Sequence, residues 1–297
     1  MKNSNFEWLD KDEYPFAPNY FSINNTRQHY IDTGSGEVLL FVHGTPSWSF
    51  DFRKLINELS WQYRCLAVDH IGFGLSEKPA DYDYSVQNHC QTLEAFIEYK
   101  QLRDITLVLH NFGGPIGFNY AFKDPGNIKR IIVLNSWLWD SSNEPGFKNL
   151  KKVLSNPLLP FLYRNLNFSP RFLLPASFGD HKLPAELLSQ YTKPFSNGSE
   201  RNGTIAFLRS LLNDQLWFGE LWSKRALLNK KPILLIWGMK DKFITGDYLD
   251  KFAAGFSTTY IKKLDNCGHF PQEECSAEVI QSIKYFLVKS NIIPQGR

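Results

Sequence analysis

The stretch Ile105-Thr-Leu-Val-Leu-His-Asn-Phe-Gly-Gly-Pro115 decides the fold that we expect for this chain. Five mostly apolar, β-favouring residues lead into a polar pair and two glycines, which is typical of a buried strand, a sharp turn and a helix that begins at the turn. In such an elbow the apex residue projects above the sheet, and glycines leave room where a Cβ would clash. The apex is Asn111, at a position that normally holds serine, cysteine or aspartate.

Strand and helix patterns alternate on both sides of this elbow. Two alternating segments joined at Asn24-Asn25 predict a hairpin within residues 18–33. Mostly apolar runs predict buried strands at residues 38–42, 64–68, 105–110, 128–134 and 232–238, and a further strand is expected near residues 259–264. Helical patterns cover residues 50–59, 86–99, 246–256 and 277–288. The fold class is therefore α/β, with a mostly parallel, doubly wound sheet of eight strands.

The alternation stops in the middle of the chain, and this defines the domain organisation that we expect. Between residues 138 and 229 no buried-strand run occurs, and several prolines separate short amphipathic helical pieces. We interpret residues 138–229 as a helical cap inserted after the sixth strand. Residues 1–137 form the first part of the core, and residues 230–297 form the second part.

Composition narrows the class of partner. The 33 basic and 30 acidic residues leave a net charge of +3 and are scattered, so we expect neither nucleic acid nor a membrane as partner. There is no secretory signal pattern and no run of 18 apolar residues, so the cytoplasm is the compartment that we expect. All four cysteines are then expected to be reduced thiols, and Cys267 is interpreted as a small residue in a tight turn.

Three polar residues stand out at the ends of the predicted strands, where ligands bind in sheets of this kind. Asn111 ends one strand, Asp241 follows the strand after the proline-rich segment, and His269 lies in the loop after the last strand. An imidazole can act as a base near neutral pH, and a carboxylate beside it selects its tautomer and stabilises its cation. The order of apex residue, acid and histidine along the chain is that of a hydrolase triad.

Three further histidines, His43, His70 and His110, also follow predicted strands. Neither an i, i+4 spacing nor nearby carboxylates support a metal site there, so we expect no metal. His110 is interpreted as a buried, hydrogen-bonded strand residue. We also expect no cofactor; the expected partners are a small hydrophobic substrate and water, and the chain is expected to be a monomer or homodimer.

Four motifs carry a family resemblance that covers nearly the whole chain. They are His43-Gly-Thr-Pro-Ser-Trp-Ser-Phe50, Asp69-His-Ile-Gly-Phe-Gly-Leu-Ser-Glu-Lys-Pro79, His110-Asn-Phe-Gly-Gly-Pro115 and Gly268-His-Phe-Pro-Gln-Glu273. They are similar to the H-G-x-P loop, the D-x-x-G-x-G-x-S-x-K-P loop, the H-D-W-G-G elbow and the terminal histidine segment of α/β-hydrolases of the haloalkane dehalogenase and epoxide hydrolase group. The chain resembles that group in fold and in the place of its cap.

The resemblance implies roles for individual residues. In that group an elbow aspartate attacks a carbon, a halide or alkoxide leaves, and water activated by the histidine releases the ester. Position 111 would then be the nucleophile site, His269 the base and Asp241 its orienting acid. Backbone N–H groups of Phe112 and Thr45 would form the anion hole, and the peptide bond before Pro46 is expected to be cis.

Three positions depart from the pattern of the group. Asn111 replaces aspartate, and a neutral amide is a poor nucleophile. Phe112 replaces a tryptophan whose indole N–H binds the departing halide, and Thr45 replaces an asparagine that binds the same ion. Halide stabilisation would then rest on backbone N–H groups and on a cap tryptophan such as Trp217. Trp137 either lines the pocket mouth or belongs to the core.

Asn111 leaves several hypotheses open. It is either a hydrogen-bonded turn residue, a substrate-trapping replacement of aspartate, an amide that the His269–Asp241 pair hydrolyses to aspartate, or a residue that positions substrate while His269 activates water. We favour a hydrolase that cleaves a carbon–halogen bond. The alternatives are an epoxide, lactone or ester hydrolase, for which Tyr163 and Tyr191 are available cap tyrosines, and a catalytically silent small-molecule binding protein.

Overall fold

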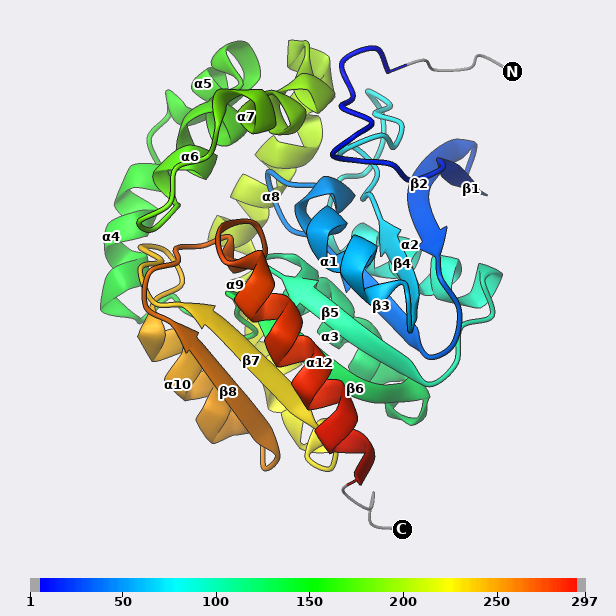
Figure 1. The fold of residues 1–297 in the computed structure, drawn as a ribbon. Helices are drawn as coiled ribbons and strands as arrows, with labels where there is room; N and C mark the ends of the chain where they lie inside the picture. Colours follow the sequence, from blue (N-terminus) through cyan, green and yellow to red (C-terminus); the bar gives the residue numbers. More distant parts are fainter. Residues whose placement is uncertain (1–5, 293–297) are drawn as a thin grey trace.

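The computed structural model of this protein describes residues 6–292 and centres on one eight-stranded sheet (Figure 1). The strand order is β1-β2-β4-β3-β5-β6-β7-β8, and every pairing from β4 to β8 is parallel. The strands are β1 (Asn19–Ile23), β2 (Thr26–Thr33), β3 (Val38–Val42), β4 (Arg64–Val68), β5 (Ile105–His110), β6 (Ile128–Leu134), β7 (Ile233–Gly238) and β8 (Thr259–Leu264). This confirms the predicted mostly parallel, eight-stranded sheet.

The first two strands form the antiparallel edge of the sheet. β1 pairs with β2, and β2 pairs with β4, both in antiparallel register. The turn between them is made by Asn24 and Asn25, which have φ values of 48° and 60°. Asparagine tolerates this left-handed conformation better than most residues, so the predicted turn at this pair is confirmed.

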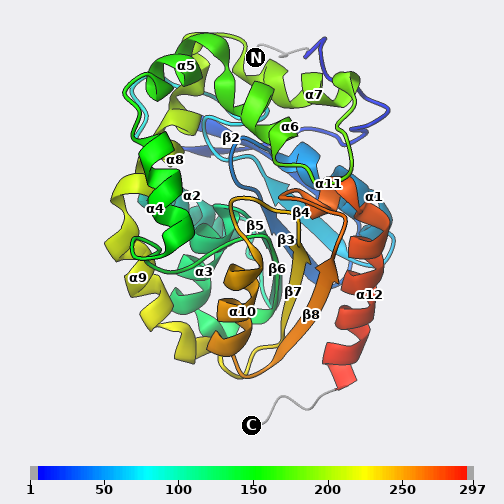
Figure 2. The same cartoon turned by 90° about the vertical axis from the view of Figure 1, so that its left-hand side faces the viewer.

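Two layers of helices cover the sheet, because successive side chains of each strand point to opposite faces. In β3, Leu40 and Val42 belong to the apolar cluster shared with α2 and α3, whereas Leu39 and Phe41 belong to the cluster shared with α1 and α12. Figure 2 shows α2, α3 and α10 on one side of the sheet and α1 and α12 on the other. The helices outside the segment between β6 and β7 are α1 (Arg53–Leu59), α2 (Val86–Tyr99), α3 (Gly113–Lys123), α10 (Gly246–Gly255), α11 (Pro271–Glu274) and α12 (Ser276–Ile292).

The segment between β6 and β7 is helical; most of it lies above the carboxyl ends of the strands, and its last helix lies beside α3 (Figures 1 and 2). We call it the cap segment. It contains α4 (Pro145–Leu154), α5 (Leu159–Leu166), a π-helical turn (Ser169–Leu173), α6 (Leu174–Ala176), α7 (Ala185–Thr192), α8 (Asn202–Asn213) and α9 (Gln215–Ser223). Short 3-10 turns lie at Ser49–Phe52, Pro125–Asn127, Lys193–Phe195, Gly198–Arg201 and Arg225–Leu228.

The predicted division at residues 138 and 229 stays a prediction, and residues 1–5 and 293–297 of its two core ranges lie outside the described residues. The last cap helix, α9, packs against α3 in the layer beneath. Within the described residues, none of the helices combines the length and hydropathy needed to cross a bilayer.

The expectation of four reduced cysteines is wrong. Cys267 and Cys275 form a disulfide, with their Cα atoms 6.6 Å apart, while Cys65 and Cys90 are free and buried. The expectation rested on compartment alone. It missed that the loop after β8 turns back to begin α11 and α12, which brings two cysteines eight residues apart in sequence within bonding distance.

Candidate active site

Asn111 occupies the apex of the elbow between β5 and α3. Its φ of 51° places it in the left-handed region, which a sharp strand-to-helix turn requires. The chain passes so close to β3 here that a Cβ on Gly113 would lie 1.9 Å from the Val42 carbonyl oxygen. The predicted elbow is therefore present, and its geometry depends on Gly113, two residues after the apex.

The side-chain amide of Asn111 is held from both ends. Its Oδ1 accepts hydrogen bonds from the backbone N–H groups of Phe112 at 2.7 Å and Thr45 at 3.1 Å. Its Nδ2 lies 2.8 Å from His269 Nε2. Because an amide NH2 only donates, His269 Nε2 is the acceptor in this pair. The carbonyl thus sits in the predicted anion hole, and the amide nitrogen faces the predicted base.

The ring of His269 is oriented by Asp241. His269 Nδ1 lies 2.5 Å from Asp241 Oδ2, and with Nε2 acting as acceptor the proton belongs on Nδ1. Both side chains are almost completely buried. A neutral imidazole whose Nδ1–H is bound to a buried carboxylate presents a free electron pair at Nε2, and its cation is stabilised once it takes up a proton.

Asp241 is itself fixed by three further donors. Its Oδ1 accepts from the backbone N–H groups of Phe243 and Ile244, and its Oδ2 accepts from Asn135 Nδ2 at 2.9 Å. Asn135, at the end of β6, was not singled out as a site residue from the sequence. Its position in the sequence could have identified it, because it follows a predicted parallel strand that lies next to the strand preceding Asp241.

The loop that carries His269 is fastened to the cap segment and to β5. The His269 N–H donates to the Ser177 carbonyl at 2.9 Å, and the His269 carbonyl accepts from His110 Nε2 at 2.8 Å. His110 is completely buried and positions the backbone of His269. His43 and His70 are likewise buried and bonded to each other, since His70 N–H donates to His43 Nε2 at 2.9 Å.

A cavity of about 130 Å³ opens beside Asn111 and His269, and most of its lining is apolar. Of the other predicted site residues, Thr45, Phe112 and Trp137 line it, whereas Trp217 does not and instead packs against Phe218. Among the described residues, the Thr45 hydroxyl and the Trp137 indole N–H are buried and have no hydrogen-bond partner. Both residues line the cavity, and neither of these polar groups is satisfied by the described residues.

The two cap tyrosines lie in different places. Tyr163 lines the cavity, and burial raises the pKa of its hydroxyl to about 12. Tyr191 is not a lining residue, because its hydroxyl donates to Glu273 Oε2 at 2.7 Å within the core. A pair of cap tyrosines at the cavity, which would mark the epoxide branch, is thus not formed by these two residues.

A group of side chains with metal-ligating chemistry lies outside this cavity and was not recognised in the sequence. His181, Cys267 and Cys275 place their donor atoms within 4.8 Å of one another. They come from a cap loop, the loop of His269 and the end of α11, so no short sequence motif connects them.

The fold and this arrangement of elbow, acid and histidine define an α/β-hydrolase. Residues 37–275 match the sequence profile of the alpha/beta hydrolase fold family, so the chain belongs to that family. It is an enzyme of the haloalkane dehalogenase-like group, as the resemblance predicted.

Individual relatives cover almost the whole chain. It is 31% identical to the cis-3-alkyl-4-alkyloxetan-2-one decarboxylase of Shewanella oneidensis, over 94% of this chain and 91% of the relative. It is 30% identical to haloalkane dehalogenase 2 of Mycobacterium tuberculosis, over 92% and 96%. The crystal structure of haloalkane dehalogenase DatA from Agrobacterium tumefaciens C58 superposes with a TM-score of 0.83 at 26% identity, covering 92% of this chain and 97% of that one.

Proposed function

We propose that this protein is a hydrolase for small hydrophobic electrophiles that first converts Asn111 to aspartate in its own active site. The observation that carries the proposal is the position of the Asn111 amide. Its carbonyl oxygen accepts hydrogen bonds from the backbone N–H groups of Thr45 and Phe112. Its nitrogen lies 2.8 Å from His269 Nε2. An acyl carbon between an anion hole and a histidine base is set up for hydrolysis.

The conversion uses only water and residues of this chain. His269 takes a proton from water while the water oxygen attacks Cγ of Asn111, and the backbone N–H groups of Thr45 and Phe112 stabilise the negative charge on Oδ1. The protonated His269 then donates to the amide nitrogen, the C–N bond breaks, and ammonia leaves. The products are a carboxylate at position 111 and an ammonium ion. Asp241 stabilises the histidine cation between the two proton transfers.

The resulting carboxylate is the nucleophile that displacement at carbon requires. We infer that it attacks a carbon bearing a halogen and that the halide leaves with the bonding electron pair, so that an ester forms at position 111. Water activated by His269 then attacks the ester carbonyl, by the same steps that removed the amide, and releases an alcohol. The small cavity with its largely apolar lining favours a short, hydrophobic halide.

A second substrate class is supported by one relative and by the polar groups of the cavity. The relative of highest identity reported above is named for an oxetan-2-one, a strained four-membered lactone. The unpartnered Thr45 hydroxyl can donate to a lactone oxygen as readily as to a halide. A β-lactone is therefore the second candidate substrate, with the same carboxylate and histidine.

Mass spectrometry of the active-site peptide tests the proposal directly. We expect purified protein, incubated at neutral pH, to show a growing fraction of peptides in which the NH2 of residue 111 is replaced by OH. The His269→Ala variant should remain an amide, because an Asn followed by phenylalanine converts slowly without assistance. Turnover of haloalkane and β-lactone panels should rise in step with the converted fraction.

Three results would separate the alternatives. A permanently amidated protein with no turnover on these panels, in which His269→Ala changes nothing, is the result expected of a silent binding protein. Turnover that survives Asn111→Ala but not His269→Ala indicates that the histidine activates water without a nucleophile. Turnover that appears only after conversion supports the proposal.

A further inference from the structure

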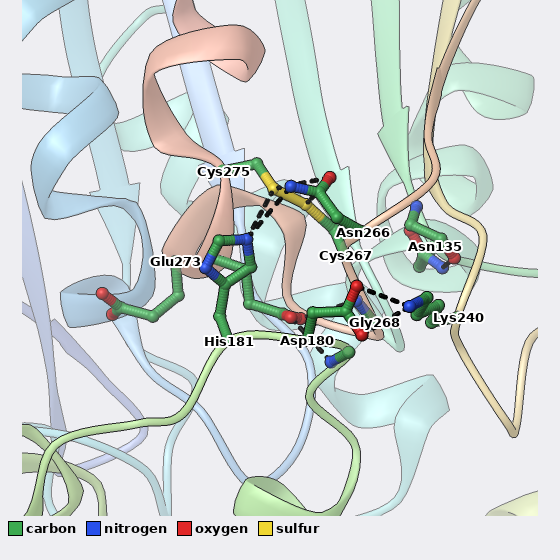
Figure 3. Close-up of a disulfide and its surroundings, with 12 residues drawn as sticks. Asn135, Asp180, His181, Lys240, Asn266, Cys267, Gly268, Glu273 and Cys275 are labelled. Atoms are coloured by element: carbon green, nitrogen blue, oxygen red, sulfur yellow. Dashed lines mark hydrogen bonds and ion pairs between the residues drawn. A yellow bond between two sulfur atoms is a disulfide. The ribbon is translucent and has the colours of Figure 1, made fainter.

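Two buried cysteines, joined by a disulfide, meet an exposed histidine (Figure 3). The Cys267–Cys275 disulfide packs against the ring of His181, whose Nε2 lies 3.7 Å from Cys275 Sγ. The three donor atoms lie within 4.8 Å of one another. Sulfur and imidazole nitrogen are the donors that zinc and similar cations prefer in proteins, and a Cys2His set with one open position is an established zinc arrangement.

The side chain of Asn266 shows how these groups face one another. Asn266 Nδ2 is 3.2 Å from His181 Nε2, so this nitrogen is an acceptor in its neutral form. Asn266 Oδ1 lies 3.6 Å from both sulfur atoms, on Cys267 and Cys275. One amide thus contacts all three donor atoms, and it must turn away before a cation can bind them.

The cluster joins two parts of the active site. Its histidine belongs to the cap loop after α6, and Cys267 stands two residues before His269. The backbones of these loops touch, since the Asp180 N–H donates to the Asn266 carbonyl at 2.9 Å, and a Cβ on Gly268 would lie 2.2 Å from the Ser177 carbonyl oxygen. An ion bound to all three side chains would therefore fasten the cap loop to the loop of His269.

We propose that the reduced form of this cluster is a binding site for a thiophilic divalent cation, with Zn²⁺ as the probe of choice. A dithiol reductant transfers two electrons and two protons to the disulfide and becomes a disulfide itself. The cation then displaces both thiol protons and binds the sulfurs of Cys267 and Cys275 and Nε2 of His181, with water as the fourth ligand. A tetrahedral site with Zn–S near 2.3 Å needs sulfurs about 3.8 Å apart, which side-chain rotation provides once the S–S bond is broken.

In this proposal the cation links the cap loop to the loop of His269, whereas the disulfide joins the loop of His269 only to the end of α11. The disulfide link forms under oxidising conditions and the cation link under reducing conditions, since metal binding needs deprotonated thiols that a disulfide does not offer. The two links share their sulfur atoms, so the two forms exclude each other.

Cobalt and zinc titrations of the full chain test this site. Protein reduced with a dithiol and freed of reductant should bind one Co²⁺ with a thiolate-to-cobalt charge-transfer band and the intense visible bands of a tetrahedral complex, and Zn²⁺ should abolish both. Oxidised protein, Cys267→Ser/Cys275→Ser and His181→Ala should each lose these bands. Cys90→Ser removes a buried free cysteine far from His181 in the chain and should leave them unchanged.

His181 is exposed, so its replacement should leave the fold intact, which circular dichroism and thermal unfolding of each variant will check. Reduced wild-type protein that takes up no Co²⁺ would overturn the proposal and leave the pair as a structural disulfide. Bands that persist in the double serine variant or in His181→Ala would overturn it too, because the ligands would then lie elsewhere.

Discussion

At the scale of single residues, the chemistry that we propose depends on the hydrogen bonds of the Asn111 side-chain amide. An ordinary turn residue was one of the hypotheses for Asn111. Its side-chain oxygen instead accepts hydrogen bonds from two backbone N–H groups, and its side-chain nitrogen contacts His269. An aspartate at this position would place one carboxylate oxygen in the anion hole and direct the other towards the histidine and the cavity. These contacts support our proposal that position 111 acts as a carboxylate, although the sequence has an amide there.

The first prediction concerns Asn111→Asp. This variant should turn over haloalkanes or β-lactones from the first measurement, without the lag that conversion of the amide imposes. In Asn111→Asp/His269→Ala the displacement step proceeds but the ester cannot be hydrolysed, because no base activates water. Intact-mass analysis after exposure to substrate should show a stable adduct on the peptide that contains residue 111.

The control for this experiment is Asn111→Ala/His269→Ala, which has no carboxylate and should gain no mass. An unmodified Asn111→Asp/His269→Ala protein, with the substrate demonstrably consumed by Asn111→Asp alone, would contradict covalent catalysis at this residue.

The second prediction concerns the leaving group. Trp137 lines the cavity, and its buried indole N–H has no partner among the described residues. We expect Trp137→Phe, in the Asn111→Asp background, to lower kcat/KM for haloalkanes about tenfold, since one hydrogen bond to a developing anion contributes about 1.5 kcal/mol. Steady-state kinetics over chloride, bromide and iodide leaving groups measures the effect.

Trp217→Phe is the matched control. Trp217 does not line the cavity, so this substitution should leave kcat/KM unchanged. Equal losses in both variants would indicate a general effect of cap packing and would exclude a specific role for the Trp137 indole.

At the scale of elements, the short helix α11 fixes the loop of His269 to the core through one buried ion pair. Glu273 in α11 contacts Arg53 in α1 through both carboxylate oxygens, and Lys54 and Tyr191 bind the same group. Burial raises the pKa of Glu273, but the hydrogen bonds and charges of Arg53 and Lys54 outweigh it, so the pKa lies below its ordinary value of 4.5.

The third prediction concerns stability against acid. Because the folded-state pKa of Glu273 is lowered, its ion pair stabilises the fold above about pH 4.5, the unfolded value, and this contribution is lost as the pH falls through the folded value. We expect Glu273→Gln to lower the free energy of unfolding by about 3 kcal/mol at pH 7, since it leaves Arg53 buried without its main partner. Urea unfolding at pH 7 and in acid should show the gap between wild type and variant closing on acidification.

Glu58→Gln provides the comparison at an exposed ion pair with Lys284. It should change the free energy of unfolding by about 0.5 kcal/mol or less. A gap that stays constant down to strong acid would show that Glu273 contributes packing and little charge.

At the scale of the whole molecule, local patterns predicted the core far better than the surroundings of the site. The apolar runs of β3 to β7 are unambiguous because both faces of a parallel sheet are covered, and Asn111, Asp241 and His269 meet because carboxyl ends of parallel strands share one edge. The sequence could not place Trp217 or Tyr191, since both belong to the cap segment, where helix periodicity does not say how the pieces pack. The Cys267–Cys275 disulfide was also missed, because a contact across a loop leaves no periodic pattern in the sequence.

The fourth prediction concerns the contact between the cap segment and the core. The loop of His269 approaches the cap loop so closely that a Cβ on Gly268 would lie 2.2 Å from the Ser177 carbonyl oxygen and 2.6 Å from Gly179 N. Gly268→Ala must push these backbones apart, which we expect to lower the free energy of unfolding by about 2 kcal/mol. Hydrogen exchange should accelerate at the amides of Asp180 and His269, which donate across this contact.

Gly126→Ala, where the nearest atom to a Cβ would lie at an ordinary 3.4 Å, should change neither quantity. Unchanged exchange at both amides in Gly268→Ala would mean that the two loops can separate without loosening their hydrogen bonds, and that the position of His269 does not depend on the cap.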